Sequence, residues 1–269
     1  METTQAIDKK YQNLLRLIAS KGSAAVAFSG GVDSSFLCYA AHEALGKAAV
    51  AVTVVSPMLS RKEFEDASRF ARNIGIEHIF AEEKEIEPEV AENPRDRCYF
   101  CKKLEFARVA ECAKQRGINT VFDGSNVDDL ADYRPGMRAL GELGIESPLK
   151  DSFFTKAEIR ELSKRFALPS WDKPAFACLA SRIPYGEKID KEKLERVEKA
   201  EEVLRQRGFR QFRVRCHGNI ARVEVAPEER ARFFNEAALD SISGDIKACG
   251  FLYAALEMEG YALGNMNRG

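Results

Sequence analysis

The chain has 269 residues, enough for one large domain or two modest ones, and 45% of them are hydrophobic, which suffices for a sizeable core. Its net charge of −1 argues against a dedicated nucleic-acid binder. No apolar run approaches the roughly 18 to 20 residues that cross a bilayer, and the first ten residues lack the apolar core of a signal peptide. We therefore expect a cytoplasmic protein without membrane contacts, in which the seven cysteines do not form a disulfide framework.

Helical and strand patterns alternate over the first 166 residues. Apolar residues at helical spacing predict helices over residues 4–20, 34–45, 61–73, 98–116 and 156–166. Short buried runs predict strands over residues 24–28, 48–55, 77–81 and 120–123. Ser60 and Thr155 each precede a glutamate by three residues, as in a capping box. The alternation predicts an α/β fold with a doubly wound, mainly parallel sheet, whose ligands bind beyond the carboxyl ends of the strands.

The pattern changes after residues 168–186, a long proline-containing stretch that is typical of a functional loop or a linker. The remaining segments predict a β-α-β unit of α+β character. They are a charged helix over 190–208, strands over 211–216 and 221–225, a helix from 227 and a strand over 246–256. We therefore predict a first domain at residues 1–184 and a smaller α+β domain at 185–269.

The segment Ser29-Gly30-Gly31-Val32-Asp33-Ser34 follows an apolar run and is typical of a pyrophosphate-binding loop. Two glycines let backbone N–H groups point into one concavity, hydroxyls add donors, and the following helix presents its positive end. A plain Gly-Gly turn needs no Asp and Ser after it. Neither Gly-x-x-x-x-Gly-Lys-[Ser/Thr] nor Gly-x-Gly-x-x-Gly occurs in the chain, which argues against γ-phosphoryl transfer and dinucleotide binding.

This loop resembles the PP-loop of the N-type ATP pyrophosphatases, which adenylate a carboxylate or an amide-like carbonyl. The resemblance implies that the phosphates of ATP lie in the loop and that adenine lies against the backbone of residues 27–29 and 53–55, with Thr53 among the contacts. Asp33 would help to hold Mg²⁺, which offsets the charge on the departing pyrophosphate. A second loop after the strand at 120–123 supplies candidates for contacts to AMP, namely Gly124, Ser125 and Asn126, followed by the helix-start acids Asp128 and Asp129.

Three cysteines are candidate ligands of a metal centre. Cys98 and Cys101 lie one turn apart at a predicted helix start, where the helix dipole favours thiolates, and Cys178 lies in the long loop. Three soft ligands suit a cubane iron–sulfur cluster with one iron open to an exogenous ligand, whereas a structural zinc site requires four. The spacing also fits two helix-start thiols and an unrelated loop thiol, so both interpretations stay open.

Four segments together resemble the LarE-type sulfur transferases: the PP-loop, residues 97–103, residues 177–182 and residues 213–217. The resemblance implies that ATP adenylates each carboxylate of pyridinium-3,5-biscarboxylic acid mononucleotide and that sulfur then displaces AMP. The product is a thiocarboxylate used in the nickel-pincer cofactor of lactate racemase maturation. The family also suggests a homo-oligomer, specifically a hexamer.

The family has two subtypes that differ in the source of sulfur. One converts its own cysteine to dehydroalanine, and Cys178 matches that position. The other adds a Cys-x-x-Cys pair and relays sulfide, or sulfur from another donor, through a [4Fe-4S] cluster. Because the pair is present here, we favour a cluster on Cys98, Cys101 and Cys178 over the sacrifice of Cys178.

Strand alternation places Arg213 and Arg215 on one face, where paired guanidinium groups suit a phosphate. A solvated strand face fits the spacing equally well, and only the family resemblance favours anchoring of the 5′-phosphate of the mononucleotide. Arg182 and Lys103, which lie near the proposed cluster ligands, would complete the anionic site, and Glu224 is a weaker candidate for a metal or substrate contact. The second domain would then bind the substrate phosphate and support oligomerisation.

Three other classes of protein fit parts of the sequence. A tRNA-thiolating PP-loop enzyme shares the loop and often the cysteines, and six arginines between residues 205 and 222 form a basic cluster. The slightly negative net charge of the chain and the lack of a recognisable RNA-binding appendage argue against this class. An amidating ligase that makes NAD or GMP needs no Cys-x-x-Cys pair, and the chain has no room for a glutaminase domain. A non-enzymatic nucleotide-binding or zinc-binding module leaves the coincidence of loop and thiols unexplained.

Overall fold

The computed structural model describes residues 2–131, 135–174 and 177–262, and the chain divides into two compact units. Unit 1 comprises residues 1–84 and 96–176, and unit 2 comprises residues 85–95 and 177–269. The predicted boundary after residue 184 therefore lies eight residues beyond the one between 176 and 177, and residues 85–95 group with unit 2. None of the helices in the described ranges combines the length and apolar composition that a membrane span requires.

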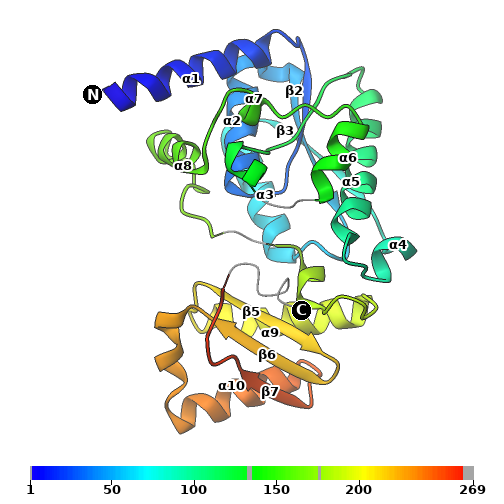
Figure 1. Ribbon diagram of the computed structural model, residues 1–269, viewed down its shortest axis with the longest axis vertical. Helices are drawn as coiled ribbons and strands as arrows, with labels where there is room; N and C mark the ends of the chain where they lie inside the picture. Colours follow the sequence, from blue (N-terminus) through cyan, green and yellow to red (C-terminus); the bar gives the residue numbers. More distant parts are fainter. Residues whose placement is uncertain (1, 132–134, 175–176, 263–269) are drawn as a thin grey trace. The chain divides into compact units, whose positions relative to one another are not determined.

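Unit 1 contains a four-stranded parallel sheet of order β3-β2-β1-β4 (Figure 1). Its strands are β1 (Ala24–Ala27), β2 (Ala49–Val55), β3 (Glu77–Glu82) and β4 (Val121–Phe122). The chain proceeds from β1 to one side of the sheet and later returns to the other side, so the strand order reverses between β1 and β4. Ligands of doubly wound sheets bind at this reversal, beyond the carboxyl ends of the strands. The predicted fold class is confirmed.

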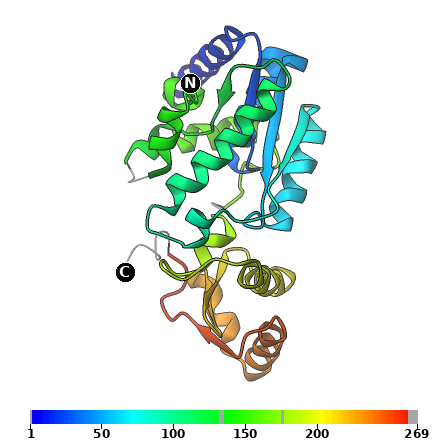
Figure 2. The same cartoon turned by 90° about the vertical axis from the view of Figure 1, so that its right-hand side faces the viewer.

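Helices cover both faces of this sheet (Figures 1 and 2). One face packs against α1 (Glu2–Ala19), α2 (Val32–Leu45), α3 (Arg61–Ile74), α7 (Pro148–Asp151) and α8 (Lys156–Arg165). The other face packs against α5 (Arg97–Lys114) and α6 (Pro135–Glu142). Alternate residues of β1 enter the two cores, because Ala24 and Val26 belong to the first and Ala25 to the second. Burial on both faces explains why the strand is apolar throughout.

The 3-10 helices η1 (Gly46–Ala48) and η2 (Val127–Ala131) complete the regular structure described for unit 1. The predicted caps are present: the Ser60 hydroxyl accepts a hydrogen bond from Glu63 N, and Thr155 and Glu158 form a complete capping box. The short helices α6 and α7 were not predicted. Both begin at a proline, whose φ angle suits the first turn of a helix. With 8 and 4 residues, they are too short to show a clear apolar periodicity.

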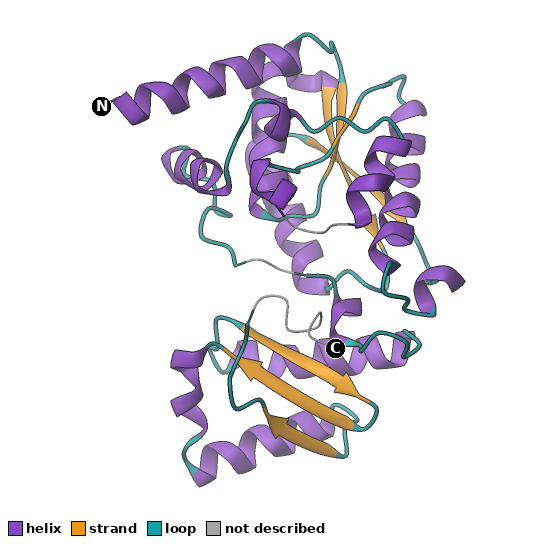
Figure 3. Cartoon of the chain, viewed as in Figure 1, coloured by secondary structure: helices purple, strands orange, loops and turns teal. Residues whose placement is uncertain are grey.

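Unit 2 contains a three-stranded sheet of order β5-β6-β7 (Figure 3). Strand β5 (Phe212–His217) is antiparallel to β6 (Ile220–Val225), and β6 is parallel to β7 (Tyr253–Leu256). Its helices are α4 (Pro88–Ala91), η3 (Leu179–Arg182), α9 (Lys191–Gln206), η4 (Pro227–Phe233) and α10 (Glu236–Ala248). The crossover from β6 through α10 to β7 is a β-α-β unit as predicted, but the helix predicted from residue 227 begins as the 3-10 helix η4, and the α-helix starts only at Glu236.

The strand predicted over residues 246–256 is wrong in its first half. Ile246 lies in the last turn of α10, and together with Ile242 it is buried on one face of that helix. Residues four apart share a helix face, so this apolar pair belongs to the helical pattern and the strand begins only at Tyr253.

Asn93 explains why residues 85–95 group with unit 2. Its side-chain amide donates to the carbonyl oxygens of Ile183, Pro184 and Glu187 at 3.3, 2.7 and 3.1 Å, and its own carbonyl accepts from Gly186 N at 3.0 Å. The residue is fully buried and adopts a positive φ of 55°. Asn93 thus helps to tie two segments 90 residues apart, together with the hydrogen bond from Ile189 N to Ala91 O at 2.7 Å, and periodicity in the sequence does not reveal this link.

Candidate active site

The predicted pyrophosphate loop lies between the end of β1 and the start of α2. The Ser29 and Ser34 hydroxyls face each other across it at 3.1 Å, and Ser34 Oγ donates to Gly31 O at 3.3 Å. Gly31 occupies the N-cap position of α2, and within the described residues no side chain caps the first N–H groups of this helix. Uncapped N–H groups and hydroxyl donors gathered at a helix N-terminus are the features that bind phosphate.

Gly30 makes the loop possible in two ways. Its φ is +72°, and a Cβ atom there would lie 3.1 Å from the Cβ of Ala67 in α3. A side chain would therefore strain the backbone and push the loop away from α3.

We expect Gly30→Ala to lower the free energy of unfolding by roughly 1–2 kcal/mol, because alanine rarely adopts this backbone conformation, and to weaken ATP binding as well. Gly22→Ala is a matched control, since Gly22 also has a φ of +72° but no atom lies within 4 Å of its added Cβ. Urea unfolding and calorimetric titration with ATP would separate the two effects. Equal ATP affinities of the two variants would contradict a role for the loop shape in binding.

The loop after β4 packs directly against the start of α2. A Cβ at Gly124 would lie 3.0 Å from Ser34 N, so only glycine permits this approach. The buried Asp123 carboxylate holds the loop by accepting hydrogen bonds from Ser125 N at 3.1 Å and from the hydroxyls of Ser125 and Ser147. Asn126 is buried, and its Oδ1 accepts from Asp128 N at 2.9 Å. The structure thus brings two predicted loops together at one edge of the sheet, while contacts of Gly124, Ser125 and Asn126 to AMP stay a prediction.

Asp33 in the first turn of α2 forms an ion pair with Lys156 of α8. Burial raises the pKa of the Asp33 carboxyl group, and the charge of Lys156 acts in the opposite direction. Its Oδ1 atom is buried and has no hydrogen-bond partner among the described residues. A buried carboxylate oxygen without a donor is the kind of ligand that Mg²⁺ prefers, so this residue fits the proposed metal.

Sequence reasoning missed three cations beside the loop. Lys156 pairs with Asp33, and Lys173 Nζ donates to Gly30 O at 3.1 Å and lies 3.8 Å from Asp66 Oδ2. Arg160 donates to the carbonyl oxygens of Trp171 and Lys173 at 2.6 and 2.8 Å and so fixes the segment that carries Lys173. The two lysines lie 123 and 143 residues along the chain from their partners, and no local pattern marks them.

Thr53 is buried, and its hydroxyl donates to Phe28 O at 2.6 Å while lying 2.8 Å from His78 Nε2. Because the hydroxyl has one proton, His78 must donate from Nε2, which leaves Nδ1 unprotonated. Nδ1 is buried and has no hydrogen-bond partner in the described part of the chain. Burial accordingly lowers the pKa of His78 to about 4. The Thr53 side chain therefore holds the strand that precedes the phosphate loop, and its predicted contact to adenine is untested.

This histidine gives the protein a defined sensitivity to acid. Since the folded-state pKa of about 4 lies below the unfolded value near 6.5, the unfolded chain binds the proton more readily between these limits. Stability is therefore expected to fall as the pH drops from about 6.5 to about 4. His78→Gln should lose less stability on acidification than the wild type, whereas His42→Gln serves as a control. Urea unfolding at several pH values checks this, and an identical acid response of wild type and His78→Gln would contradict it.

The three predicted cluster ligands are divided between the units. Cys98 and Cys101 lie in the first turns of α5 in unit 1, with Cys98 exposed and Cys101 half-buried. Cys178 is exposed and precedes η3 in unit 2. Among the residues that are described, no group of three or more His, Cys, Asp and Glu side chains is gathered as a metal site. The cluster on these three thiols stays a prediction.

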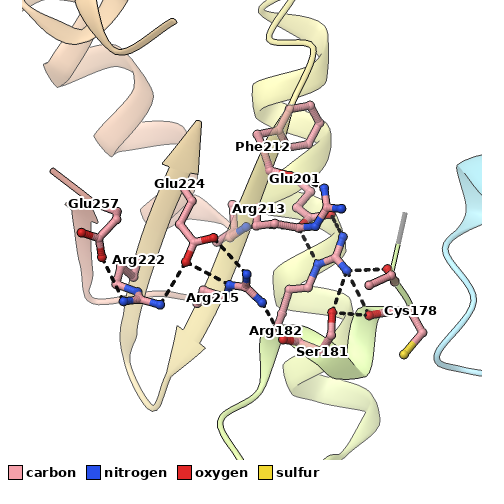
Figure 4. Close-up of polar contacts among 12 residues, drawn as sticks. Cys178, Ser181, Arg182, Glu201, Phe212, Arg213, Arg215, Arg222, Glu224 and Glu257 are labelled. Atoms are coloured by element: carbon pink, nitrogen blue, oxygen red, sulfur yellow. Dashed lines mark hydrogen bonds and ion pairs between the residues drawn. The ribbon is translucent and has the colours of Figure 1, made fainter. Parts of the chain in front are cut away.

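Arg182 fixes the segment that carries Cys178 (Figure 4). It is 1% exposed and forms a two-point pair with Glu201, with Nε–Oε1 and Nη2–Oε2 distances of 2.8 and 2.9 Å. Its third nitrogen, Nη1, donates to the carbonyl oxygens of Ala177 and Cys178. The buried guanidinium thus locks the backbone around the cysteine.

Arg213 and Arg215 lie on the same face of β5, as predicted, and converge on Arg182 in Figure 4. Arg215 forms a two-point pair with the fully buried Glu224 at 3.1 and 2.9 Å and donates to Ser181 O at 2.7 Å. Arg213 donates to Phe212 O at 2.6 Å, and burial, followed by the charge of Arg182, lowers the pKa of Arg213. The interpretation as a solvated strand face is therefore wrong, because both guanidinium groups are buried.

Lys103, the fourth predicted substrate ligand, lies in unit 1, on α5. Its Nζ atom is 3.7 Å from Glu142 Oε2, and half of its side chain is exposed. The structure therefore joins three of the four predicted substrate ligands in one network and places Lys103 in the other unit.

Known proteins resemble this chain along most of its length. Residues 7–126, which include the phosphate loop, match the NAD synthase family. The chain is 33% identical over 250 residues to pyridinium-3,5-bisthiocarboxylic acid mononucleotide synthase of Lactiplantibacillus plantarum, covering 90% of this chain and 88% of that protein. The chain belongs to this LarE family of PP-loop enzymes. The predicted family resemblance is confirmed.

One relative is more similar in sequence than this synthase, and another is less similar. An uncharacterized protein of Synechocystis sp. is 44% identical over 263 residues, which is 97% of this chain and 98% of the relative. A component of the glutamine-hydrolyzing GMP synthase of Archaeoglobus fulgidus is 23% identical over 274 residues, or 94% of this chain and 83% of that protein. The alignments to the synthase of L. plantarum and to the Synechocystis protein are long enough to include most of both units.

Proposed function

We propose that this protein is an ATP-dependent sulfur transferase. It would adenylate the carboxylates of pyridinium-3,5-biscarboxylic acid mononucleotide, release pyrophosphate, and let sulfur displace AMP to give thiocarboxylates for a nickel-pincer cofactor. The observation that supports this best is the 33% identity, over 90% of the chain, to a synthase named for the bisthiocarboxylic acid product.

The loop edge of unit 1 supplies groups suited to adenylation. The uncapped N–H groups of α2 and the hydroxyls of Ser29 and Ser34 would bind the phosphates of ATP. Asp33 would hold Mg²⁺, which when bound neutralises charge on the leaving pyrophosphate. Gly124 lets the loop after β4 pack against the start of α2, because its backbone approaches Ser34 without a side chain. The attacking carboxylate oxygen of the substrate would form its new bond to the α-phosphorus as pyrophosphate departs.

The arginine network of unit 2 is suited to an anionic substrate. The buried side chains of Arg182, Arg213 and Arg215 lie near one another in Figure 4, and the positive charge of Arg182 helps burial to lower the pKa of Arg213. A bound phosphate would offset the positive charge gathered there. We infer that Arg213 and Arg215, supported by Arg182, anchor the 5′-phosphate, and that Lys103 of unit 1 contributes a further positive charge.

The sulfur would come from sulfide, or from another donor, through a [4Fe-4S] cluster on Cys98, Cys101 and Cys178. Two thiols one turn apart at the exposed start of α5 have suitable donor chemistry, and Cys178 is exposed on a segment locked by Arg182. The alternative is that Cys178 itself gives up its sulfur in the same reaction.

Iron and acid-labile sulfide analysis of the protein purified without oxygen separates these sources of sulfur. About four irons per chain, lost in Cys98→Ala, Cys101→Ala and Cys178→Ala but kept in Cys112→Ala, is the expected result. Cys112 is a suitable control because it is a half-buried thiol of the same helix. No iron after chemical reconstitution would instead point to sacrifice of Cys178, which mass spectrometry would detect as dehydroalanine after one turnover.

We further propose a cytoplasmic homo-oligomer, a hexamer by family resemblance, with unit 2 in its interfaces. Unit 2 exposes several large apolar side chains, which contacts between subunits would cover: Phe234, Leu252, Tyr253 and Met258. Light scattering on the eluted protein checks the assembly, and a monomer at micromolar concentration would contradict it.

The proposed reaction itself is tested by measuring pyrophosphate release from ATP and Mg²⁺. Release should require the mononucleotide and should not be stimulated by ammonia or tRNA. Stimulation by ammonia would favour an amidating ligase, and stimulation by tRNA, with steep salt dependence of binding, would favour an RNA-thiolating enzyme.

A further inference from the structure

The ion pair between Lys156 and Asp33 occupies a carboxylate that the proposed metal needs. Lys156 is the first residue of α8, and its backbone N–H donates to Asp128 Oδ2 at 2.8 Å, so the main chain of this lysine is fixed beside η2. Its ammonium group reaches across to Asp33 Oδ2. The other oxygen, Asp33 Oδ1, is buried without a hydrogen-bond partner in the described ranges.

A magnesium ion and the lysine ammonium group compete for this carboxylate. Both are cations, and a divalent ion bound to Asp33 would repel an ammonium group held on the same side chain. The lysine is not trapped, since 35% of its side chain is exposed and its four-carbon stem is flexible. Lys173 does not share this conflict, because its ammonium group bonds Gly30 O and approaches Asp66.

The place to which the displaced ammonium group would move is close by. Asp33 lies between Val32 and Ser34 in the phosphate loop, so any ATP bound there brings its pyrophosphate oxygens to the vicinity of Lys156. A compact ammonium group with three donors suits such oxygens.

We propose that Lys156 exchanges partners during each catalytic cycle. It holds Asp33 in the nucleotide-free protein and transfers to the pyrophosphate of ATP when the metal takes the carboxylate. This inference rests on the proposed use of ATP and Mg²⁺, but it is independent of the sulfur acceptor. Lys156 is thus a ligand of the leaving group, and it keeps the metal site closed until nucleotide and metal arrive together.

The experiment compares two binding reactions in wild type, Lys156→Met and the control Lys10→Met. Lys10 also pairs with a carboxylate of α8, that of Glu158, but does not approach the loop. Binding of Mn²⁺ alone is followed by electron paramagnetic resonance at pH 8. Binding of α,β-methylene-ATP with Mn²⁺ is followed by calorimetry. Neither probe involves the mononucleotide or sulfur.

Lys156→Met is expected to bind Mn²⁺ alone several-fold more tightly, because the competing cation is gone. It should bind the ATP analogue roughly tenfold more weakly or worse, because a charge-assisted contact to the phosphates is lost. Lys10→Met should match the wild type in both. A loss of both affinities in Lys156→Met would overturn the exchange and make Lys156 a support for Asp33, and unchanged affinities would exclude any role.

A second variant keeps the proposal testable if Lys156→Met does not fold. Lys156→Arg keeps the charge, and its guanidinium group can form a bidentate pair with both oxygens of Asp33. Mn²⁺ alone should therefore bind more weakly to this variant than to the wild type. Tighter Mn²⁺ binding by this variant would contradict the exchange. If wild type itself failed to bind the ATP analogue, the proposed use of ATP would fail first, which distinguishes that failure from failure of the exchange.

Discussion

Replacing Asp33 by alanine is expected to reduce the rate of pyrophosphate release on the order of 100-fold to 1000-fold, which is the usual effect of removing one group that stabilises developing charge. Asp33 combines a buried oxygen without a hydrogen-bond donor in the described residues with a position in the first turn of α2, beside the phosphate loop. The released partner, Lys156, is partly exposed and can be hydrated, so the variant should fold.

The measurement is the mononucleotide-dependent rate of pyrophosphate formation at saturating Mg²⁺. Asp8→Ala is a suitable control because Asp8 forms a remote ion pair with Arg165 on the helical face of unit 1. Its rate should match that of the wild type. Normal release by Asp33→Ala would remove Asp33 from the mechanism and leave the Lys156 pair without a function.

The second large effect concerns the arginine network of unit 2. Replacing both Arg213 and Arg215 by alanine should raise the apparent KM for the mononucleotide far more than the apparent KM for ATP, because the proposed phosphate contacts belong to the mononucleotide. Because a charged hydrogen bond typically contributes enough binding free energy for a tenfold change, we expect the apparent KM for the mononucleotide to rise roughly tenfold or more.

The structure shows how to separate binding from folding in this experiment. Arg215 is paired with the fully buried Glu224, and removing one partner of a buried pair costs about 3–5 kcal/mol of stability. Arg215→Met combined with Glu224→Met therefore removes both charges of the pair, and Arg213→Ala tests the second proposed phosphate ligand separately. Arg222→Ala is the control, since Arg222 lies in the same network and is partly exposed. Equal changes of both KM values in Arg213→Ala would indicate a structural role.

Local chemistry explains why much of the fold was predictable from the sequence. Hydrophobic runs gave the four strands of unit 1 to within two residues, and the hydroxyls of Ser60 and Thr155 cap α3 and α8. The phosphate loop was recognisable because its glycines and hydroxyls are adjacent in the chain. Cys98 and Cys101 were placed at a helix start, where the structure has them.

Features that depend on distant segments were not predictable. The partner of Asp33 lies 123 residues away, and nothing near Lys156 distinguishes it from the other lysines of the chain. Arg215 is buried against Glu224 and Ser181, which lie in other segments, so the alternation of the strand alone could not exclude a solvated face. Residues 85–95 join unit 2 through polar contacts such as those of Asn93 and Ala91. In each case the position of the side chain or segment depends on a polar contact with a residue that is distant in the sequence. Such contacts leave no periodic pattern in the sequence.

The most direct test of the proposed function is mass spectrometry of the mononucleotide after anaerobic incubation with the protein, ATP, Mg²⁺ and sulfide. The account predicts products in which one and then both carboxylates have exchanged an oxygen for sulfur, with one AMP and one pyrophosphate formed for each exchange. Several turnovers per chain would support sulfur relay by a cluster. Formation of AMP and pyrophosphate without any sulfur in the mononucleotide would contradict the proposed function.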